Sequence, residues 1–504
     1  MPILRKPLVW LLCLLLSNLL LAPALQAREL KIDDLSRLAD VDDIQVSSDG
    51  LRVAYVVGTI DAGADKRDSQ VWGVDWSGGA PVQLTRGEQS ASTPRWSPDG
   101  QSLAFLRAGP KAERGDQVWL LDRRGGEAAM LTDLEGGVSD FAWSPDGKRL
   151  ALLHRPTPAP AKDADGEEIP RPVVIDRFQF KSDGDGYRQK QAARRIHLFD
   201  IASRQSSVLN AGAESDEEAP TWSPDGTRIA FLGNRDKDAD RHDSSKLYVS
   251  DARAGATPRQ LTDFPGRGSD GPLAWSPDGT RIAFVRGDVP KYWLYSQPRL
   301  AVVPVAGGEA QVQVLTEALD RDVSDPVFSA DGRSIDVLVT DTRNRYRLRV
   351  SATDGKTQLL SAADGVISAV DSGGGHTAVL FSHDDRPNEV YAIASGKLRP
   401  LTTHNAALLA EVTLARSEDI QFTASDGVEV HGLLTRPPGK SGARGLPTVL
   451  WIHGGPYGQD EHVFDTERQI FAANGYAVLQ INYRGGNGRG GAFGRGIHGA
   501  WGTR

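Results

Sequence analysis

The stretch Trp222-Ser-Pro-Asp-Gly226, followed by Arg228-Ile-Ala-Phe-Leu232, decides the fold of most of this chain. Proline presets the backbone for the second position of a tight turn, and glycine accepts the left-handed conformation that closes the turn. The short apolar run that follows is typical of a buried strand. The stretch therefore predicts a turn that leads directly into a strand.

The same phrase recurs along the chain at a nearly constant period. Strong copies begin at Trp96, Trp143, Trp222 and Trp275, weaker copies at Val46 and Phe328, and a degenerate copy spans Asp371-Ser-Gly-Gly-Gly375. The aspartates of the six clearer turns are residues 49, 99, 146, 225, 278 and 331, so most steps are 47 to 53 residues. Each unit also contains a short strand that ends in Leu-Thr, as at Leu261-Thr262. Four short strands per repeat are the signature of a β-propeller blade, and we predict seven blades over residues 43–410.

One step of the repeat is longer than the others. The 79 residues from Asp146 to Asp225 are about 30 more than a blade needs. The excess lies near residues 155–190, contains Pro156-Thr-Pro-Ala-Pro160, and includes Phe178-Gln-Phe180. Proline and charge favour a disordered surface insert, whereas the aromatic residues favour an arm that covers a substrate cavity. The sequence leaves both interpretations open.

Residues 411–504 follow a different pattern, which predicts a second domain. Residues 420–435 predict a hairpin, 449–452 a strand buried on both faces, 464–474 a helix and 476–482 a second buried strand. Hairpin, strand, helix and strand in this order begin an α/β sheet, in which ligands bind beyond the carboxyl ends of the strands. We therefore expect the N-terminal part of an α/β domain after the propeller.

The strand predicted at residues 449–452 is followed by His453-Gly454-Gly455-Pro456. Glycine has no Cβ, so a backbone N–H can come close to a ligand, as an oxyanion hole requires. A His-Gly-Gly loop occupies this place in α/β-hydrolases. The alternative is a turn that ends the strand and has no chemical role.

The catalytic triad of such a hydrolase has no candidate in this chain. The nucleophile of an α/β-hydrolase lies on a Gly-x-Ser-x-Gly turn downstream of the oxyanion loop, and aspartate and histidine follow it. No Gly-x-Ser-x-Gly occurs in residues 1–504. The base comes last in this order, so His453, His462 and His498 are not expected to act as the base. We expect the chain as written to be a truncated form without hydrolase turnover.

The motifs together resemble the prolyl oligopeptidase family of serine peptidases, nearest its acylaminoacyl-peptidase and dipeptidyl-peptidase-like bacterial members. The resemblance rests on the Ser-Pro-Asp-Gly repeats, the loop at residues 453–456, and the segments Ser425-Asp-Gly-Val-Glu-Val-His-Gly432, Asn482-Tyr-Arg-Gly485 and Ile497-His-Gly-Ala-Trp-Gly502. It implies an all-β seven-bladed β-propeller followed by the N-terminal part of an α/β-hydrolase domain. It also implies a serine peptidase that hydrolyses short peptides admitted by the propeller.

The resemblance assigns roles to the loop residues. It implies that the N–H of Gly455 forms half of the oxyanion hole, that Gly454 lets the loop turn, and that His453 and Pro456 support it. It implies no metal and no cofactor.

Two other polar sites receive a structural interpretation. The resemblance implies a structural role for Arg484, with pairing inside its own loop. The Asp-Trp-x-Tyr-Glu-Glu pattern that anchors a free amino terminus in one subgroup is absent. We therefore expect Glu217-Glu218, which precedes a blade turn, to be solvated.

The start of the chain predicts export. Arg5 and Lys6 precede an apolar run at residues 8–21, and small residues lead to Ala27, so residues 1–27 predict a cleaved signal peptide and a periplasmic or secreted protein. A membrane anchor is the alternative, but the run is shorter than the roughly 20 residues that a span needs. Cys13 is the only cysteine, so the mature chain would have no disulfide. Residues 28–42 predict an N-terminal segment with a short helix.

Three classes of function bear on this pattern. A net charge of −8 argues against nucleic acid as a partner. The repeats alone also occur in non-enzymatic TolB-like propellers, so a binding or assembly module is the alternative to a peptidase. An esterase shares the oxyanion loop but does not normally carry the propeller.

Overall fold

The computed structural model describes residues 27–502, apart from residues 112–113, 157–162, 164, 166–168, 170–171, 183–185, 188–191, 211, 213–214, 242–243, 267–270 and 362–363. Almost all of the predicted signal peptide and part of the predicted insert lie outside the described residues. Within the described ranges, no helix combines the length and the apolar composition needed to cross a membrane.

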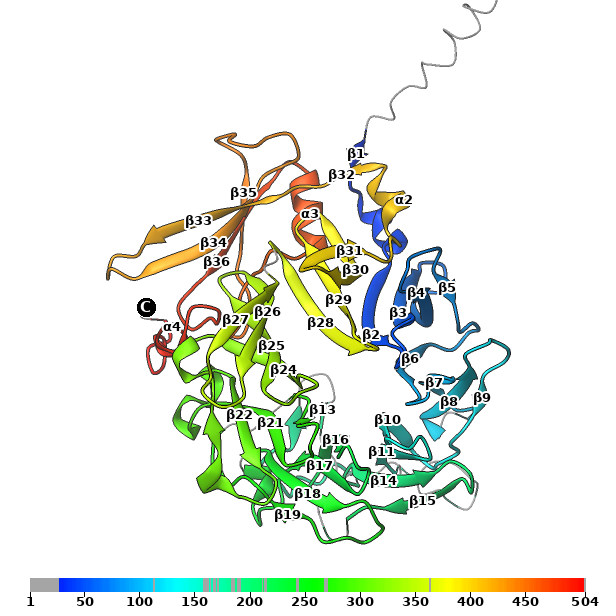
Figure 1. The fold of residues 1–504 in the computed structure, drawn as a ribbon. Helices are drawn as coiled ribbons and strands as arrows, with labels where there is room; N and C mark the ends of the chain where they lie inside the picture. Colours follow the sequence, from blue (N-terminus) through cyan, green and yellow to red (C-terminus); the bar gives the residue numbers. More distant parts are fainter. Residues whose placement is uncertain are drawn as a thin grey trace, which may run out of the picture.

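Antiparallel sheets arranged in a ring make up the larger part of the molecule (Figure 1). Five of them are four-stranded, and we number these one to five in chain order. Sheets one and two contain β2 (Asp40–Val46), β3 (Arg52–Asp61), β4 (Lys66–Asp75) and β5 (Val82–Gln83), then β6 (Ala91–Trp96), β7 (Ser102–Ala108), β8 (Asp116–Asp122) and β9 (Ala129–Met130). Sheets three and four contain β10 (Gly137–Trp143), β11 (Arg149–Arg155), β14 (Arg195–Asp200) and β15 (Gln205–Val208), then β16 (Glu217–Trp222), β17 (Arg228–Gly233), β18 (Lys246–Asp251) and β19 (Arg259–Gln260).

The ring continues with sheet five and an eight-stranded sheet. Sheet five contains β20 (Ala274–Trp275), β21 (Arg281–Arg286), β22 (Arg299–Pro304) and β23 (Gln313–Val314). The eight-stranded sheet contains β24 (Asp322–Phe328), β25 (Ser334–Asp341), β26 (Asn344–Ser351), β27 (Thr357–Ser361), β28 (Val366–Gly373), β29 (His376–His383), β30 (Arg386–Ala394) and β31 (Lys397–Pro400). Its two halves join through one parallel residue pair, Arg345 with Val366. This repeated four-stranded arrangement is that of a propeller.

The recurring Ser-x-Asp-Gly turns have one hydrogen-bond pattern. In each turn the serine hydroxyl donates to the aspartate at 2.6 Å, and the glycine φ lies between 66° and 73°, so the turn needs glycine. The indole N–H of Trp222, for example, donates to the carbonyl of Ala142 in the preceding sheet at 3.1 Å. The motif therefore closes a hairpin and ties one sheet to the next.

The Leu-Thr motif ends sheets one, two, four and five and the last part of the eight-stranded sheet in the same way. The hydroxyl of Thr262 accepts a hydrogen bond from the N–H of Leu247 at 2.9 Å, and Leu261 is buried beside it. Equivalent bonds at 2.8–2.9 Å involve Thr85, Thr132, Thr316 and Thr402. The motif thus satisfies a backbone donor at the outer edge of the sheet.

The long step in the repeat falls between β11 and β14. Its described part includes β12 (Lys181–Ser182), paired with β13 (Gly186–Tyr187). The N–H of Phe178 donates at 2.6 Å to Asp240, which lies in the short 3₁₀ helix η3 (Ala239–Arg241). The insert therefore contacts the connection between β17 and β18.

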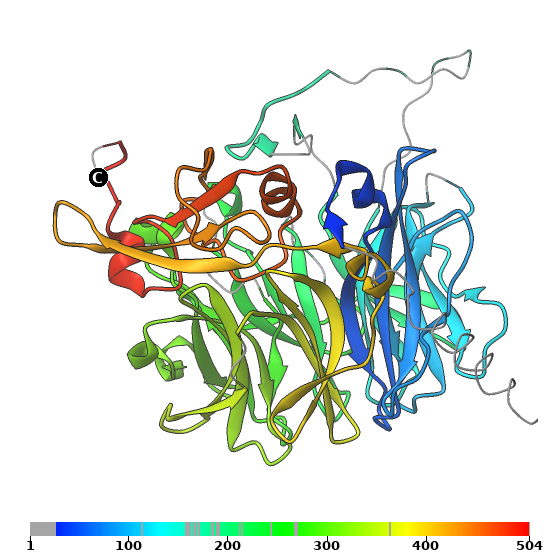
Figure 2. The same cartoon turned by 90° about the horizontal axis from the view of Figure 1, so that it is seen from above.

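The C-terminal elements form a separate mixed sheet in the order β33-β34-β36-β35. They are β33 (Ser417–Thr423), β34 (Glu429–Thr435), β35 (Thr448–Trp451), α3 (Thr466–Ala473), β36 (Ala477–Asn482) and α4 (Gly491–Arg495). Asp465 caps α3 by accepting the N–H of Arg468. The predicted hairpin, helix and second strand are confirmed. Figure 2 shows these orange and red elements at one face of the ring.

Short elements complete the fold around this sheet. β1 (Arg28–Glu29) pairs in parallel with β32 (Val412–Thr413), which follows α2 (Ala406–Leu409), and the 3₁₀ helix η1 (Ile32–Arg37) comes next after β1. Among the described residues, three more 3₁₀ helices lie between strands of the ring: η4 (Pro290–Tyr295), η5 (Glu309–Gln311) and η6 (Glu317–Leu319).

The prediction of a strand buried on both faces at residues 449–452 is wrong. Leu450 is 57 % exposed and Ile452 is 66 % exposed. β35 lies at the edge of the sheet and pairs only with β36 among the described strands. Its Trp451 packs near Phe471 of α3, with ring centroids 6.3 Å apart, so the helix covers one face.

This exposed apolar edge is expected to drive self-association. An unpaired strand edge with apolar side chains is a template for pairing with another copy. In a protein of residues 28–504, the double substitution Leu450→Glu/Ile452→Glu should shift the equilibrium towards the monomer in sedimentation velocity, with little loss of stability. The control Leu433→Glu, in the buried part of β34, should instead destabilise the C-terminal sheet. An unchanged association state in the double variant would contradict this interpretation.

Candidate active site

The loop at residues 453–456 has a geometry that only glycine permits at its third position. Gly455 has φ of +130°, and a Cβ at this position would lie 2.6 Å from the backbone nitrogen of Tyr457. Gly454, in contrast, has no atom within 4 Å of such a Cβ. Gly455 is exposed, and no described residue accepts its N–H. A backbone donor is therefore directed at solvent beyond the carboxyl end of β35.

The segment after β36 holds this loop in place. The Tyr483 ring stacks on the His453 ring at 4.5 Å between centroids, and its hydroxyl donates to the His453 carbonyl at 2.6 Å. The His453 ring also hydrogen bonds to the Gly454 carbonyl at 2.8 Å, through Nδ1. A Cβ on Gly485 would lie 3.2 Å from Pro456, so glycine at 485 allows the two loops to pack.

A second set of hydrogen bonds ties the loop to β36. The side-chain oxygen of Asn482 accepts the N–H of Asp460 at 2.7 Å, and its amide donates to the Asp460 carbonyl at 3.0 Å. Gln480 donates to the Asp460 carboxylate at 3.0 Å. Burial raises the pKa of Asp460, and the nearby His453 and Arg468 oppose this rise.

The sequence did not indicate the residues that attach the loop to the propeller. The Tyr457 hydroxyl donates to Asp322, at the start of β24, at 2.8 Å. Burial raises the pKa of Asp322 to about 7, although the bond from Tyr457 opposes it. Gln459 accepts the N–H of Arg343 at 3.1 Å. Tyr457 follows the glycine loop directly, but no sequence feature marked Asp322 as its partner.

A buried polar cluster joins the two parts of the chain. We call Asp384, Asp419, His462 and Arg468 the interdomain clasp. Asp384, in the turn between β29 and β30, lies 3.2 Å from Arg468 of α3, and their side chains are 1 % and 2 % exposed. His462 lies between the carboxylates of Asp384 and Asp419, at 3.1 Å from each. The clasp fixes α3 against the ring.

Three residues around the clasp have ligand atoms close enough for a metal ion. These atoms of His383, Asp384 and His462 all lie within 4.8 Å of one another. However, both ring nitrogens of His462 already contact carboxylates, and the Arg468 guanidinium neutralises Asp384. A cation beside that guanidinium would be repelled, so we assign this cluster to ion pairing.

The clasp is expected to weaken as the pH rises above 6.5. Burial lowers the pKa of His462, but Asp384 and Asp419 outweigh it and raise this pKa above the ordinary 6.5. A raised folded-state pKa gives stability that is complete below pH 6.5 and is lost as the pH rises through the folded-state value. The facing groups include Arg343, paired with Asp419 at 2.6 Å.

Hydrogen exchange of α3 between pH 5.5 and pH 8.5, corrected for intrinsic exchange, measures this loss. Protection should fall with pH in the native protein. His462→Gln should remove most of that dependence, and an unchanged dependence in His462→Gln would contradict the assignment.

The expectation of a solvated Glu217-Glu218 pair is wrong for Glu217. Its side chain is 1 % exposed and lies 2.6 Å from Arg235. It also accepts the N–H of Ile196 at 2.9 Å. Glu218 is partly exposed and pairs with Arg194 at 2.6 Å. Glu217 is therefore buried and bridges sheets three and four, a role that a charged pair in the sequence does not reveal.

Arg484 also differs from expectation in its partner. It contacts the Asp426 carboxylate in the turn between β33 and β34, not a residue of its own loop. The guanidinium thus joins the hairpin to the segment that supports residues 453–456.

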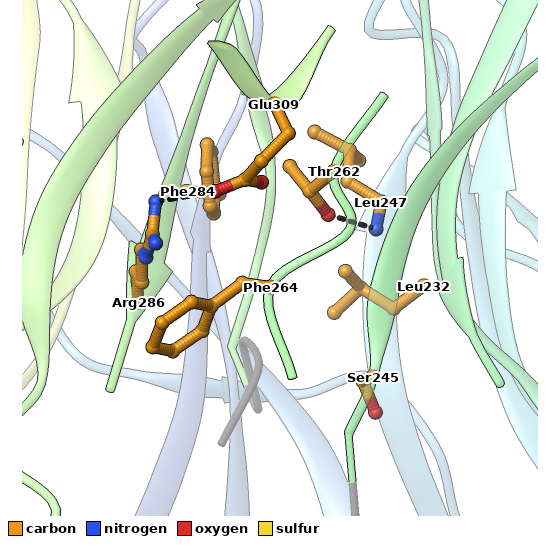
Figure 3. Close-up of a pocket in the computed structure, with 8 residues that line it drawn as sticks. All are labelled: Leu232, Ser245, Leu247, Thr262, Phe264, Phe284, Arg286 and Glu309. Atoms are coloured by element: carbon orange, nitrogen blue, oxygen red, sulfur yellow. Dashed lines mark hydrogen bonds and ion pairs between the residues drawn. The ribbon is translucent and has the colours of Figure 1, made fainter. Parts of the chain in front are cut away.

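A small cavity lies between sheets four and five (Figure 3). Phe264, Phe284 and Leu247 line it, and Arg286 pairs with Glu309 at 3.0 Å on one side. Its volume of about 10 Å³ leaves room for about one water molecule. It is therefore a packing void and is too small for a peptide.

The chain is similar in sequence to known peptidases. The model of the prolyl oligopeptidase family matches residues 462–504. The chain is 30 % identical over 495 residues to the uncharacterized peptidase YuxL of Bacillus subtilis, a match that covers 94 % of this chain and 73 % of that protein.

Solved structures share the fold. The acylaminoacyl peptidase of Pyrococcus horikoshii superposes with a TM-score of 0.75 at 19 % identity, over 93 % of this chain and 69 % of that chain. The β-propeller domain of the trilobed protease from Pyrococcus furiosus gives a TM-score of 0.52 at 14 % identity, over 73 % of this chain and 97 % of that domain. These structures share the fold, and the relative at 30 % identity, together with the family match at residues 462–504, shows that the chain belongs to the prolyl oligopeptidase family of serine-type peptidases.

Proposed function

We propose that this protein is an exported serine peptidase that hydrolyses short peptides. The observation that carries the proposal is the exposed N–H of Gly455, held without an acceptor among the described residues at the end of β35. A rigid donor at this place can stabilise the oxyanion of a tetrahedral intermediate. Peptidase relatives over nearly the whole chain support the peptide as the substrate class.

The proposed reaction needs the oxyanion donor of this chain and a catalytic triad. A serine attacks the acyl carbon, a histidine takes the serine proton and passes it to the leaving amine, and an aspartate orients the histidine. The Gly455 N–H stabilises the negative oxygen in the intermediate, while His453 and Pro456 support the loop and Gly454 tolerates a side chain. Residues 1–504 contain no Gly-x-Ser-x-Gly, so we place the triad outside them.

The propeller would restrict access by size. We propose that the eight-stranded sheet counts as two blades, because one residue pair alone joins its halves, which gives seven blades with sheets one to five. The propeller then spans residues 43–410, with residues 28–42 before it and the hydrolase part at 411–504. A narrow channel admits thin peptides and excludes folded proteins. A signal peptide at residues 1–27 would direct the protein to the periplasm or the medium.

Peptide hydrolysis by a form of the protein that also carries the Gly-x-Ser-x-Gly nucleophile tests the proposal. We expect turnover of blocked and free tripeptides, and no digestion of a folded protein of domain size. Equal rates on tripeptides and folded protein would exclude the size filter. Absence of peptide turnover, with ester turnover retained, would favour an esterase, and absence of both would favour a binding module.

A further inference from the structure

An arginine follows the turn glycine by two residues in four of the repeats. These residues are Arg52, Arg149, Arg228 and Arg281, whereas Ser102 and Ser334 occupy the position in the other two. The turn after β28, in the half of the eight-stranded sheet that follows Ser334, has no tryptophan. Ser102 faces sheet three, whose turn has the full Trp-Ser-Pro-Asp-Gly motif. Of these six positions, Ser102 is therefore the one at which a complete Trp-Ser-Pro-Asp-Gly turn faces a residue other than arginine.

Arg149 shows what the arginine does. Its guanidinium lies 4.8 Å from the ring centroid of Trp222 in the next sheet. It donates to the carbonyls of Gly226 at 3.1 Å and Ala252 at 2.8 Å. These three contacts form a site for a planar cation: an aromatic face and two backbone acceptors.

The same site recurs around the ring. Arg228 lies 5.3 Å from the Trp275 ring and donates to Gly279 at 3.2 Å. Arg281 lies 5.5 Å from the Phe328 ring and donates to the carbonyls of Gly332 at 2.8 Å and Ala352 at 3.3 Å.

Between sheets one and two, Arg123 takes this place. It lies 5.8 Å from the Trp96 ring, donates to Gly100 at 3.1 Å and pairs with Asp49 at 2.6 Å. Arg52 donates to the Arg123 carbonyl at 3.0 Å.

The junction between sheets two and three keeps the acceptors but has no cation. Ser102 of sheet two occupies the repeat position that Arg149 occupies in sheet three. Ile201 of sheet three occupies the repeat position that Arg123 occupies in sheet two. A groove of about 430 Å³ occupies the place, and its lining includes Trp143, Gly147 and Ile201. This volume falls in the range of ligand pockets. No basic residue lines the groove, and no described side chain donates to the Gly147 carbonyl.

Two carboxylates give the groove a negative charge. Asp99 and Asp146 line it, and neither forms an ion pair with a described residue. Hydrogen bonds from Ser97 and Ser144 lower the pKa of these two carboxyls, so both are ionised at neutral pH. The groove therefore combines an indole face, two backbone carbonyls and negative charge.

We propose that the groove between sheets two and three binds the guanidinium of an arginine side chain presented by a peptide. The guanidinium would lie on Trp143 and donate to the carbonyls of Gly147 and Ile201, as Arg149 does on the next sheet. The groove lies at the turn end of the strands, whereas the contacts to the C-terminal sheet come from the opposite ends, at Asp322 and Asp384. This site is separate from the proposed peptidase reaction.

Fluorine NMR of protein labelled with 5-fluorotryptophan tests the site. Trp143→Phe assigns the Trp143 resonance. N-acetyl-arginine amide should shift this resonance saturably, with a Kd on the order of millimolar, as expected for a single side chain. N-acetyl-citrulline amide has nearly the same shape without the charge and should cause no saturable shift.

Variants of Ser102 provide the matched controls. Ser102→Arg should fill the groove from within the chain, abolish the shift caused by the arginine amide and raise the Tm. Ser102→Ala removes only a hydroxyl and should bind as the native protein does. No saturable shift with the arginine amide, an equal shift with the citrulline amide, or an undiminished shift in a folded Ser102→Arg protein would each overturn the proposal.

Discussion

Replacing Gly455 with alanine is expected to lower kcat/KM about 10²–10³-fold in a form of the protein that carries the catalytic serine, the usual loss for one oxyanion donor. The backbone at Gly455 has φ of +130°, which L residues rarely adopt, and the new Cβ would lie 2.6 Å from the Tyr457 nitrogen. The loop must shift, and the N–H then leaves the place where the oxyanion forms. Steady-state hydrolysis of a tripeptide amide measures the loss.

Gly454→Ala is the matched control for this experiment. Gly454 is the preceding residue, is exposed, and has no atom within 4 Å of an added Cβ. Its substitution should leave kcat/KM within a few-fold of the native value. Equal losses in the two variants would show that any change in the loop lowers activity, without a specific role for the Gly455 N–H. Native activity in Gly455→Ala would show that Gly455 takes no part in the reaction.

Removing the buried Asp384 carboxylate from the interdomain clasp is expected to cost about 3–5 kcal/mol of stability. Asp384→Ala leaves the Arg468 guanidinium buried without its partner, and it also removes one of the two carboxylates that contact His462. The loss should appear as a lower urea midpoint and as faster hydrogen exchange in α3 and β33. Sheets one to five should exchange as before.

The neighbouring residue provides the control. Asp385 pairs with Arg416 at 2.7 Å and contacts the His383 ring at 3.3 Å, but the Asp385 and Arg416 side chains are 19 % and 64 % exposed, so solvent screens their pair. Asp385→Ala should therefore cost no more than about 1 kcal/mol. A cost for Asp384→Ala no larger than that for Asp385→Ala would contradict the assignment of the clasp.

The parts of the fold that repeat in the sequence could be predicted from it. The Ser-Pro-Asp-Gly turns and the Leu-Thr ends depend on local chemistry, namely a serine–aspartate bond, a left-handed glycine and a threonine that accepts a nearby N–H. These bonds lie within one hairpin or one strand pair, so each copy of the motif carries the information for its own structure. The hairpin at β33–β34 and helix α3 are local in the same sense.

Features that depend on contacts between distant segments could not be predicted. The partner of Tyr457 is Asp322, and the partner of Arg468 is Asp384, both far away in the chain. Glu217 looked like a solvated charge because Arg235 reaches it only after the strands pair. The exposure of Leu450 also follows from its place at the edge of the sheet, which the apolar sequence of β35 does not reveal.

Labelling with a fluorophosphonate probe tests the central claim most directly. The account assigns the propeller and one oxyanion donor to residues 28–504 and places the nucleophile outside them. Purified protein of residues 28–504 should therefore show no labelled serine by mass spectrometry, whereas a form that also carries the Gly-x-Ser-x-Gly serine should label stoichiometrically at that serine. Stoichiometric labelling of any serine within residues 28–504, or an unlabelled Gly-x-Ser-x-Gly serine in a folded protein, would contradict the account.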